Sequence, residues 1–496
     1  MRLMKQMLFA LLIGLVSTAA QAATYYISPG GDGGKEGKGT NVSPFMTFAN
    51  AISHMKGGDT LVLLDGTYTG NGNGNVSGIP AGTALSPTVI QAKNRHAAVL
   101  DSITVTIAGA DYITIDGLKL KAGAGATALT IGASDKATAH ITVKNTGVYK
   151  SAHSGAEPAV QLIGDTATRN TTHCLLEDCW FYGRAKNILE VRYTQGTTLR
   201  RCVVRHDGGE GHRLAISSIY THRSTDGILE NCIVLDTDPK QKPRVKGIFI
   251  QGPTSEPYDT VQVLGCIALD TYSESSTASR GMEVTGDTGA VLTNCIVWKT
   301  PRRDGGYSAG FSVAKGEGKG VTPKVTLSHC TSKGWGFGVL GDPHFDAVQS
   351  TLIMNTYHHV LGGIHLMEYC YMMNSESGEY EGNITQGPSN AWKATATQFV
   401  PKYIARIDDA AVKGTGHDGG DRGANIVYRY VDGKLTGDLL WPWPNEEFIK
   451  ADFHNLAEGA RGKWYENQPR QSFTQYIWEY AGSPSPWGSS REDKKE

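Results

Sequence analysis

The sequence predicts an all-β fold, a parallel β-helix in which short strands stack coil upon coil. The first observation is a repeated phrase of apolar, polar, Cys and apolar residues, such as LENCIVLD at 229–236. Neighbouring cysteines of this phrase are 23 residues apart at the closest (179 to 202) and 35 at the widest (295 to 330), which is typical of stacked repeats. The second observation is that 61 of the 496 residues are glycine, which favours many turns and therefore many short strands. The repeated cysteines are Cys179, Cys202, Cys232, Cys266, Cys295 and Cys330.

The segments around these cysteines have the pattern of strands. In TVQVLGCIALD (260–270) and KVTLSHC (324–330), apolar and polar residues alternate, and turn-forming residues bound each run. The variable step favours a β-helix, whose loops differ in length while its strands stay stacked. Leucine-rich repeats would need a regular grid of leucines, which the sequence lacks. The same pattern continues upstream without cysteine, from 98 to 122.

The first coil of a solenoid needs a cover, and the segment 44–68 predicts one. Its apolar residues fall on one face of a short helix. Gly57 and Gly58 end this helix, and DTLVLLDG begins the first strand. The apolar face consists of Phe45, Phe48, Ala49, Ile52 and Met55.

The two ends of the chain differ from the repeats. Residues 1–22 are predicted to be a signal peptide, because a positive start and a short apolar stretch precede an Ala-Gln-Ala cleavage site. Residues 23–400 form the β-helix domain with its cap. Residues 401–496 predict a mostly irregular, short-helical extension that caps the last coil, with a disordered tail from about residue 487. We therefore expect a secreted protein, periplasmic or extracellular, and a monomer.

The charges of the chain nearly balance, with 47 Lys and Arg against 48 Asp and Glu. Nucleic-acid binders usually carry a basic excess, so the sequence argues against a nucleic-acid partner. No segment after the predicted signal peptide is long and apolar enough for an integral membrane span.

The opening of the chain resembles a known group of proteins. The segments YYISPGGDGG, SPFMTFANAISHMKGGDTLVLLDGTYTG and SPTVIQAKN are similar to the start of secreted right-handed parallel β-helix proteins of the polysaccharide lyase type. The similarity is to the pectate-lyase-like and the alginate lyase/chondroitinase B-like groups. GHDGGDRGANI (416–426) resembles the glycine-rich closing segment of many such proteins. The resemblance implies a right-handed solenoid and an acidic polysaccharide as partner.

A cation recurs near the start of the strand that follows each cysteine strand. The aligned segments are AKNILEV (185–191), HRLAISS (212–218), VKGIFIQ (245–251) and SRGMEVT (279–285). In a parallel β-helix such residues form a column with about 4.8 Å between coils, which suits a polyanion lying across the coils. The alternative is a strand edge with ordinary surface cations. The predicted column is Lys186, Arg213, Lys246 and Arg280.

β-Elimination of a uronate polymer needs a neutralised carboxylate, a base for the C5 proton and an acid for the leaving oxygen. A Lys or Arg can act as the base only where burial and neighbouring cations lower its pKa. In the lyases that this chain resembles, a Lys and an Arg on neighbouring coils take these roles, and Ca²⁺ holds the uronate. The resemblance thus makes Lys246 the base and Arg280 the acid or carboxylate clamp. The substrate-binding residues are predicted to be Lys186, Arg213, His212 and Tyr220.

Carboxylates follow the cysteine strands on three consecutive coils, and they predict a site for Ca²⁺, which prefers several oxygen ligands. The same residue types also favour turns, which is the alternative. The sequence lacks the closely spaced pair of Asp that the resemblance implies for a pectate-lyase-type calcium site. The predicted metal ligands are Asp207, Asp236, Asp238 and Asp270, with Glu210 and Glu274 nearby.

The sequence therefore predicts a polysaccharide lyase acting on an acidic polysaccharide. Two alternatives stay open: a non-catalytic β-helix that binds or organises glycan, and a glycoside hydrolase of the polygalacturonase type, which needs a specific carboxylate pair. The repeated cysteines are predicted to be buried free thiols that stack in an interior ladder. His358 and His359 are adjacent and should point to opposite faces of a strand, which argues against a metal site there.

Overall fold

A computed structural model gives the arrangement of most of the chain. The predicted signal peptide, except its last residue, and the predicted disordered tail lie outside the described residues. The described residues are 22–30, 37–123, 125–151, 157–208, 216–237, 244–252, 260–271, 273, 278–286, 288–299, 307–315, 323–354, 356–373, 378–394, 401–404, 406–407, 409–458, 464 and 471–481.

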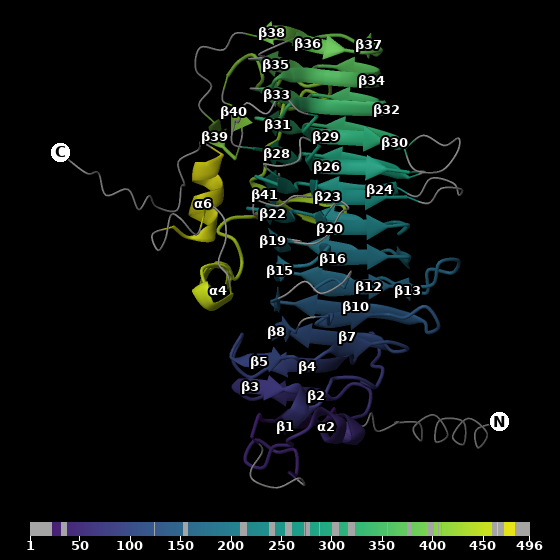
Figure 1. The fold of residues 1–496 in the computed structure, drawn as a ribbon, viewed down its shortest axis with the longest axis vertical. Coiled ribbons are helices and arrows are strands. Elements are labelled where there is room, and N and C mark those ends of the chain that lie inside the picture. Colours follow the sequence, from purple (N-terminus) through teal and green to yellow (C-terminus); the bar gives the residue numbers. More distant parts are fainter. Residues whose placement is uncertain are drawn as a thin grey trace, which may run out of the picture.

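Over these residues the strands stack in parallel into three faces of a right-handed β-helix, which confirms the predicted fold class (Figure 1). Face 1 is built from β6 (Val105–Ile107), β9 (Leu129–Ile131), β12 (Val160–Ile163), β16 (Asn187–Arg192), β20 (Ile216–His222), β23 (Val245–Gln251), β26 (Arg280–Thr285), β29 (Ala309–Ala314), the first half of β32 (Phe337–Gln349), the first half of β34 (His358–Glu368) and β36 (Gly378–Glu381).

Face 2 joins face 1 in one sheet, because the long strands β32 and β34 bend from one face into the other. Its other strands are β1 (Thr24–Ile27), β2 (Thr60–Leu63), β4 (Thr88–Ala92), β7 (Asp111–Asp116), β10 (Thr138–Lys144), β13 (Thr171–Thr172), β14 (Leu175–Glu177), β17 (Thr194–Gln195), β18 (Thr198–Arg200), β21 (Ile228–Glu230), β24 (Thr260–Leu264), β27 (Gly289–Thr293), β30 (Lys324–Ser328) and β37 (Ile384–Gln386).

Face 3 is a separate parallel sheet. It contains β3 (Gly66–Thr69), β5 (Ala98–Asp101), β8 (Lys119–Ala122), β11 (Gly147–Lys150), β15 (Trp180–Arg184), β19 (Val203–Gly208), β22 (Ile233–Leu235), β25 (Ile267–Leu269), β28 (Ile296–Trp298), β31 (Thr331–Lys333), β33 (Leu352–Met354), β35 (Tyr371–Met373) and β38 (Ala391–Ala394).

The N-terminal cap is the helix α2 (Phe48–His54), at the purple end of Figure 1. Thr47 begins it, because its side chain accepts a hydrogen bond from the Asn50 amide over 3.3 Å. The predicted apolar face is confirmed except at one position: Ala49 is exposed, and Ala51 is buried in its place. The short helix α3 (Gly70–Asn73) follows β3.

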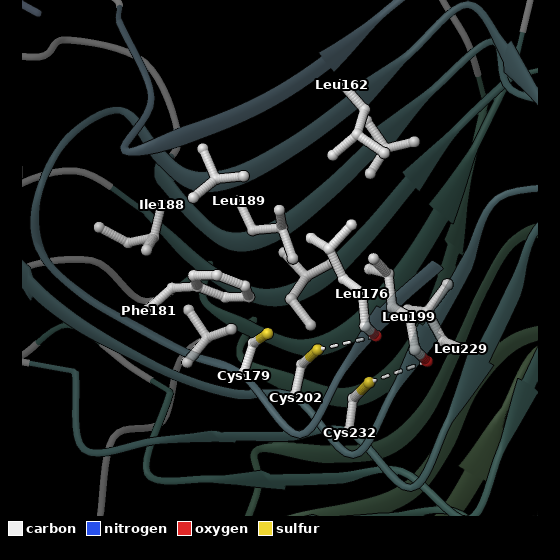
Figure 2. Packing of buried hydrophobic residues seen from close by; sticks show 14 of the residues in the cluster. Leu162, Leu176, Cys179, Phe181, Ile188, Leu189, Leu199, Cys202, Leu229 and Cys232 are labelled. Atoms are coloured by element: carbon white, nitrogen blue, oxygen red, sulfur yellow. Dashed lines mark hydrogen bonds between the residues drawn. The ribbon is translucent and has the colours of Figure 1, made fainter. Parts of the chain in front are cut away.

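The repeated cysteine phrase marks the corner between face 2 and face 3. The residue before each cysteine adopts the left-handed conformation, as at Arg201 (φ 50°), Asn231 (φ 51°) and Gly265 (φ 61°), and so turns the chain sharply. The cysteine then points inward. Figure 2 shows Cys202 and Cys232 donating to backbone carbonyl oxygens of the preceding coil, over 3.4 and 3.3 Å. All eight cysteines of the chain are buried and unbridged, which confirms the predicted ladder of free thiols.

Over its described residues, the C-terminal extension does not lie on the last coil, where it was predicted to form a cap. It runs back along the outer side of face 3, where its yellow helices lie beside the middle coils (Figure 1). The physical reason lies in the middle strands of face 3, such as β15, β22 and β25, which are apolar on both sides, so that the outward side also needs a cover. The extension contains β39 (Pro401–Tyr403), β40 (Arg406–Ile407), β41 (Tyr428–Val431), β42 (Lys434–Leu439), α4 (Glu446–Phe453), the 3-10 helix η1 (Leu456–Glu458) and α6 (Phe473–Tyr480).

A second hydrophobic core fills this interface. In the register of face 3, Trp180, Val203 and Ile233 point outward one above another. Trp464 and Tyr476 of the extension pack against this outer column. Burying a large apolar side chain contributes about 1.5–3 kcal/mol, so a column of them firmly holds the extension.

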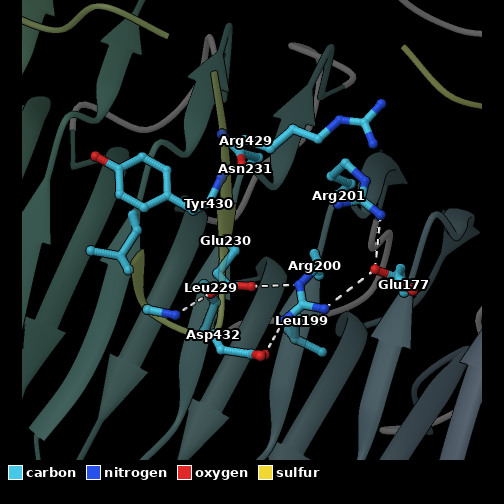
Figure 3. A network of polar contacts seen from close by, with 12 residues as sticks. Glu177, Leu199, Arg200, Arg201, Leu229, Glu230, Asn231, Arg429, Tyr430 and Asp432 are labelled. Carbon is cyan, nitrogen blue, oxygen red and sulfur yellow. Dashed lines mark hydrogen bonds and ion pairs between the residues drawn. The ribbon is translucent and has the colours of Figure 1, made fainter. Parts of the chain in front are cut away.

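Ion pairs fix the β41–β42 hairpin to the β-helix (Figure 3). Arg200 Nε lies 2.6 Å from Glu230 Oε2, and the same guanidinium pairs with Asp432 of the hairpin loop. Glu177 binds Arg201 over 2.8 Å. Arg200, Arg201 and Glu230 are buried and Glu177 is half-buried, whereas Asp432 is exposed; the buried charges are all paired, so this cluster is structural. Among the described helices, none is long and apolar enough to cross a membrane.

Candidate functional site

Lys246 and Arg280 lie side by side on face 1. They are partners in the parallel register of β23 and β26, as the aligned sequences predicted. The register continues downward to Ser217 on β20 and Asn187 on β16. The observed column is therefore Asn187, Ser217, Lys246 and Arg280.

The predicted positions of Lys186 and Arg213 in this column are wrong. Lys186 precedes the column by one residue and is half-buried, and its carbonyl oxygen accepts a hydrogen bond from the Ser217 amide over 3.0 Å. Ser217 occupies the place that the sequence alignment gave to Arg213. Arg213 and His212 lie outside the described residues. The error arose because the loops before these strands differ in length, so the loop end is not a fixed reference for register.

Glu283 joins the two cations, and the sequence analysis missed it. Lys246 Nζ forms an ion pair with Glu283 Oε1, and Arg280 Nε lies 3.3 Å from Glu283 Oε2. Ser312 Oγ of the next coil also contacts Oε2, over 3.4 Å. All three charged side chains are less than a tenth exposed. The outward place of Glu283 between two inward apolar residues in GMEVT was the signal that could have identified it.

Burial lowers the pKa of Lys246 from its usual 10.5 to about 8. The neighbouring charges of Arg244 and Arg280 lower it too, whereas the Glu283 carboxylate raises it. Lys246 Nζ also lies 3.2 Å from the centroid of the Phe249 ring. An amine with a pKa near 8 is partly neutral at neutral pH, and a neutral amine is what a general base requires. Burial likewise lowers the pKa of Arg280 below its usual value.

Tyr220 lies on the same face as Lys246, one coil away. Its ring stacks on Phe249 and on His222, with centroid distances of 5.1 and 5.5 Å. The Tyr220 hydroxyl donates to Gln251 Oε1 over 2.6 Å. Burial raises the pKa of Tyr220 and lowers that of His222 to about 4, so both rings are uncharged at neutral pH. The place of Tyr220 is compatible with substrate binding.

Three of the carboxylates that were predicted to hold calcium, Asp207, Asp236 and Asp270, lie at or beside strands of face 3 and are buried. Both oxygens of Asp207 accept hydrogen bonds from the Arg205 guanidinium, over 2.6 and 2.9 Å. Asp236 Oδ1 accepts from the Tyr476 hydroxyl over 2.8 Å, and Oδ2 accepts from the Trp464 amide over 3.3 Å. Protein donors therefore engage the oxygens that calcium would need.

Asp270 is buried close to Asp236. Burial, and then the charge of Asp270, raises the pKa of Asp236 to about 6. Asp238 lies outside the described residues, as do Glu210 and Glu274. Asp207 and Asp236 do not fit the predicted calcium site, because protein donors occupy their oxygens and the extension covers Asp236. The sequence could not reveal this, because the covering residues are more than 200 positions away in the chain.

A pocket of about 690 Å³ opens on face 1 beside Arg280. Its walls come from β26, β29, β32 and β34 and include Arg280, Tyr307, His344, His365 and Asn383. Part of the wall is bare backbone. At Gly362 (φ 98°) a Cβ would lie 1.9 Å from the carbonyl oxygen of Gly341, so a side chain has no room there. The pocket is thus a hollow in the sheet surface between cationic and imidazole side chains.

His344 and His365 at this pocket form a cluster with Asp346, which the sequence analysis did not identify. The signal was the alternation in PHFDA (343–347), because His344 and Asp346, on either side of Phe345, share one face of the strand. The adjacent pair His358 and His359 is more conspicuous in the sequence. His359 is buried and hydrogen-bonded to Thr356, as expected for adjacent residues on opposite faces.

Fold and site together define a right-handed parallel β-helix protein with a buried Lys–Glu–Arg cluster beside a pocket. No family model and no curated protein matches the sequence. Among solved structures, the chain is similar to pectate lyase Pel9A, with 14% identity over 84% of this chain and 91% of that chain and a TM-score of 0.42. It is similar to an alginate lyase from Paenibacillus sp. str. FPU-7, with 16% identity, 74% and 99% coverage and a TM-score of 0.39. The A-module of the mannuronan C-5 epimerase AlgE4 of Azotobacter vinelandii has 12% identity, 68% and 91% coverage and a TM-score of 0.40.

Proposed function

We propose that the protein is a secreted polysaccharide lyase that cleaves an acidic, uronate-containing polysaccharide by β-elimination. The observation that carries this proposal is the pair formed by Lys246 and Arg280. The two residues are register partners on adjacent coils, the pKa of Lys246 is lowered to about 8, and Arg280 lines the pocket.

In the proposed reaction a uronate residue of the polymer lies in the pocket. Arg280 binds its carboxylate, because a guanidinium stays protonated and matches a carboxylate with two donors. The neutral amine of Lys246 removes the C5 proton. The electrons of that C–H bond form the C4=C5 double bond, the C4–O bond breaks, and water protonates the leaving oxygen. Glu283 positions both cations, since it pairs with each of them.

The burial of the two cations favours an enzyme over a protein that only binds or organises glycan. A binding face would present exposed aromatic rings and cations at their usual pKa. Lys246 and Arg280 are instead buried and paired, and the pKa of each is lowered. A hydrolase of the polygalacturonase type needs a specific pair of carboxylates. This alternative finds less support, because Asp236, a carboxylate that could belong to such a pair, is buried under the extension.

The test is to incubate the purified full-length protein with alginate, pectate, polygalacturonate and chondroitin sulfate, with Ca²⁺ or with a chelator. β-Elimination makes an unsaturated uronate, so the ultraviolet absorbance should rise with one substrate. Lys246→Met should abolish that rise, because methionine fills the space without an amine. No rise with any of the four polymers would contradict the proposal.

Lys186→Met is the matched control. Lys186 lies on the same side of the coils but outside the column, and it is half-buried. Its replacement should lower the rate only modestly. If both variants lost activity equally, general charge on face 1 would explain the result and Lys246 would not be the base.

A further inference from the structure

We propose that His344, Asp346 and His365 bind a divalent transition-metal ion of the Zn²⁺ class at the edge of the pocket. This site is separate from the proposed lyase residues and does not depend on them. Its ligands come from β32 and β34, at the bend where these strands pass from face 1 to face 2.

The strand register brings the three side chains together. His344 and Asp346 flank the buried Phe345, so both point outward from β32. Phe345 on β32 is the register partner of Ile364 on β34. The next residue on β32 is Asp346 and the next on β34 is His365, so these two side chains are neighbours. Three potential ligands therefore share one patch of the outer surface, and this results directly from β-sheet geometry.

The distances are close to those of a bound metal. One ligand atom from each residue lies within 4.8 Å of the other two. His365 Nδ1 is 3.9 Å from Asp346 Oδ1, and the centroids of the two imidazole rings are 3.6 Å apart. Tetrahedral Zn²⁺ with bonds of roughly 2.0–2.1 Å places its ligand atoms roughly 3.3 Å apart. The two imidazole rings lie ring on ring, whereas two ligating imidazoles each point a nitrogen at the ion, so binding requires His365 to rotate away from His344; His365 is exposed and so can rotate.

Asp346 is already oriented for this role. Its Oδ2 accepts a hydrogen bond from the Val325 amide over 2.7 Å. That bond fixes the carboxylate and leaves Oδ1 on the side of His365. Hydrogen bonds that hold a ligating group in place are a regular feature of protein metal sites.

The ligand types select the metal. Two imidazoles and one carboxylate suit Zn²⁺ and related transition-metal ions, whereas Ca²⁺ and Mg²⁺ prefer oxygen ligands alone. Three protein ligands leave a coordination position open to water or to an oxygen of a bound molecule. His344 and His365 both line the pocket, so this position faces the space that also contains Arg280 and Asn383.

A second cluster offers an internal comparison. His329, His417 and Asp418 also lie within reach of one another. Their atoms are engaged in hydrogen bonds: His329 Nε2 contacts Asp418 over 3.1 Å, and His417 Nδ1 contacts Ser350 Oγ over 2.8 Å. A metal would have to displace Ser350 from His417, so the first cluster is the better site.

The experiment is a titration of the tag-free, full-length protein with Zn²⁺ by calorimetry and with Co²⁺ by visible absorption. We expect one ion per chain, a Co²⁺ spectrum typical of nitrogen and oxygen ligands, and no displacement by excess Ca²⁺. His344→Gln and His365→Gln should each weaken Zn²⁺ binding by at least about tenfold. The double variant of His329→Gln and His417→Gln should bind as the original protein does.

The absence of stoichiometric binding would overturn the proposal, as would binding that the two glutamine variants leave unchanged. Loss of binding in the His329/His417 control would move the site to the other cluster and also overturn it. Circular dichroism of each variant checks the fold. His365 is exposed, so His365→Gln should stay folded and keeps the test decisive. Since metal binding is measured without substrate, failure of the lyase proposal would not affect this result.

Discussion

Replacing Lys246 by methionine should stabilise the protein at neutral pH. Burial lowers the pKa of Lys246 from 10.5 to about 8, and each unit of pKa corresponds to about 1.36 kcal/mol. Keeping this amine charged therefore costs the folded state about 3 kcal/mol. The folded state binds the proton more weakly than the unfolded state, so the cost is complete below pH 8 and disappears as the pH rises to about 10.5. Methionine carries no charge, so we expect Lys246→Met to raise the free energy of unfolding at pH 7 by up to about 3 kcal/mol.

The assay is urea unfolding at pH 7 and at pH 10, for the original protein, Lys246→Met and Lys186→Met. The gain from Lys246→Met should be large at pH 7 and small at pH 10. Lys186 is half-buried and outside the column, so its replacement should change stability by less than about 0.5 kcal/mol. If Lys246→Met lowered stability at pH 7, the ion pair with Glu283 would be a net stabilising contact, and the reasoning that makes Lys246 a poised base would be refuted.

Three further predictions concern other parts of the molecule. Asp236→Asn should stabilise the protein at pH 7 and not below about pH 4. Burial raises the pKa of Asp236 to about 6, so the contribution of this carboxyl to stability is lost as the pH rises through that value. Urea unfolding at both pH values would measure this effect, and an equal effect at both would contradict the prediction. The eight cysteines should resist a thiol reagent in the native protein and all react in denaturant, because they are buried. Burial also raises the pKa of a thiol, as at Cys370, where it raises the pKa to about 12. Fast labelling of the native protein would show that the ladder is accessible and would contradict this prediction. Cleavage after Ala22 would leave a charged amine on Ala23, whose nitrogen lies 2.7 Å from Asp59 Oδ1. Asp59→Asn should therefore lower the free energy of unfolding of the secreted protein by about 1.5–3 kcal/mol. Mass spectrometry of the N-terminus tests the cleavage site, and unfolding in urea tests the loss of stability.

Much of the fold could be predicted from the sequence because its signals are local. The polar residue or glycine before each repeated cysteine takes the left-handed conformation, and the cysteine then points inward, as at Asn231 and Cys232. Both features repeat within a few positions of each other, so they appear in any single coil. The cap helix was predicted for the same reason, and its one error, Ala49 for Ala51, is a small rotation of the helix face.

The candidate site could be predicted only in part. Lys246 and Arg280 were paired correctly, because their strands begin at the same distance from the corner. Lys186 and Arg213 were misaligned, because loops of different length separate the corners in earlier coils. Glu283 was missed because its contact with Lys246 joins residues on neighbouring coils, and sequence distance hides that proximity.

Local patterns in the chain are enough to predict a stacked β-solenoid with a ladder of buried thiols, since alternation and turn-forming residues act over a few positions. The place of the extension depends instead on packing between distant segments. The middle strands of face 3 are apolar on their outer side, and Trp464 and Tyr476 from the end of the chain cover that surface and bind Asp236. Likewise only the stacking of β32 on β34 brings His344 and His365 to one pocket. Such contacts depend on register and docking across many residues, which no local pattern specifies.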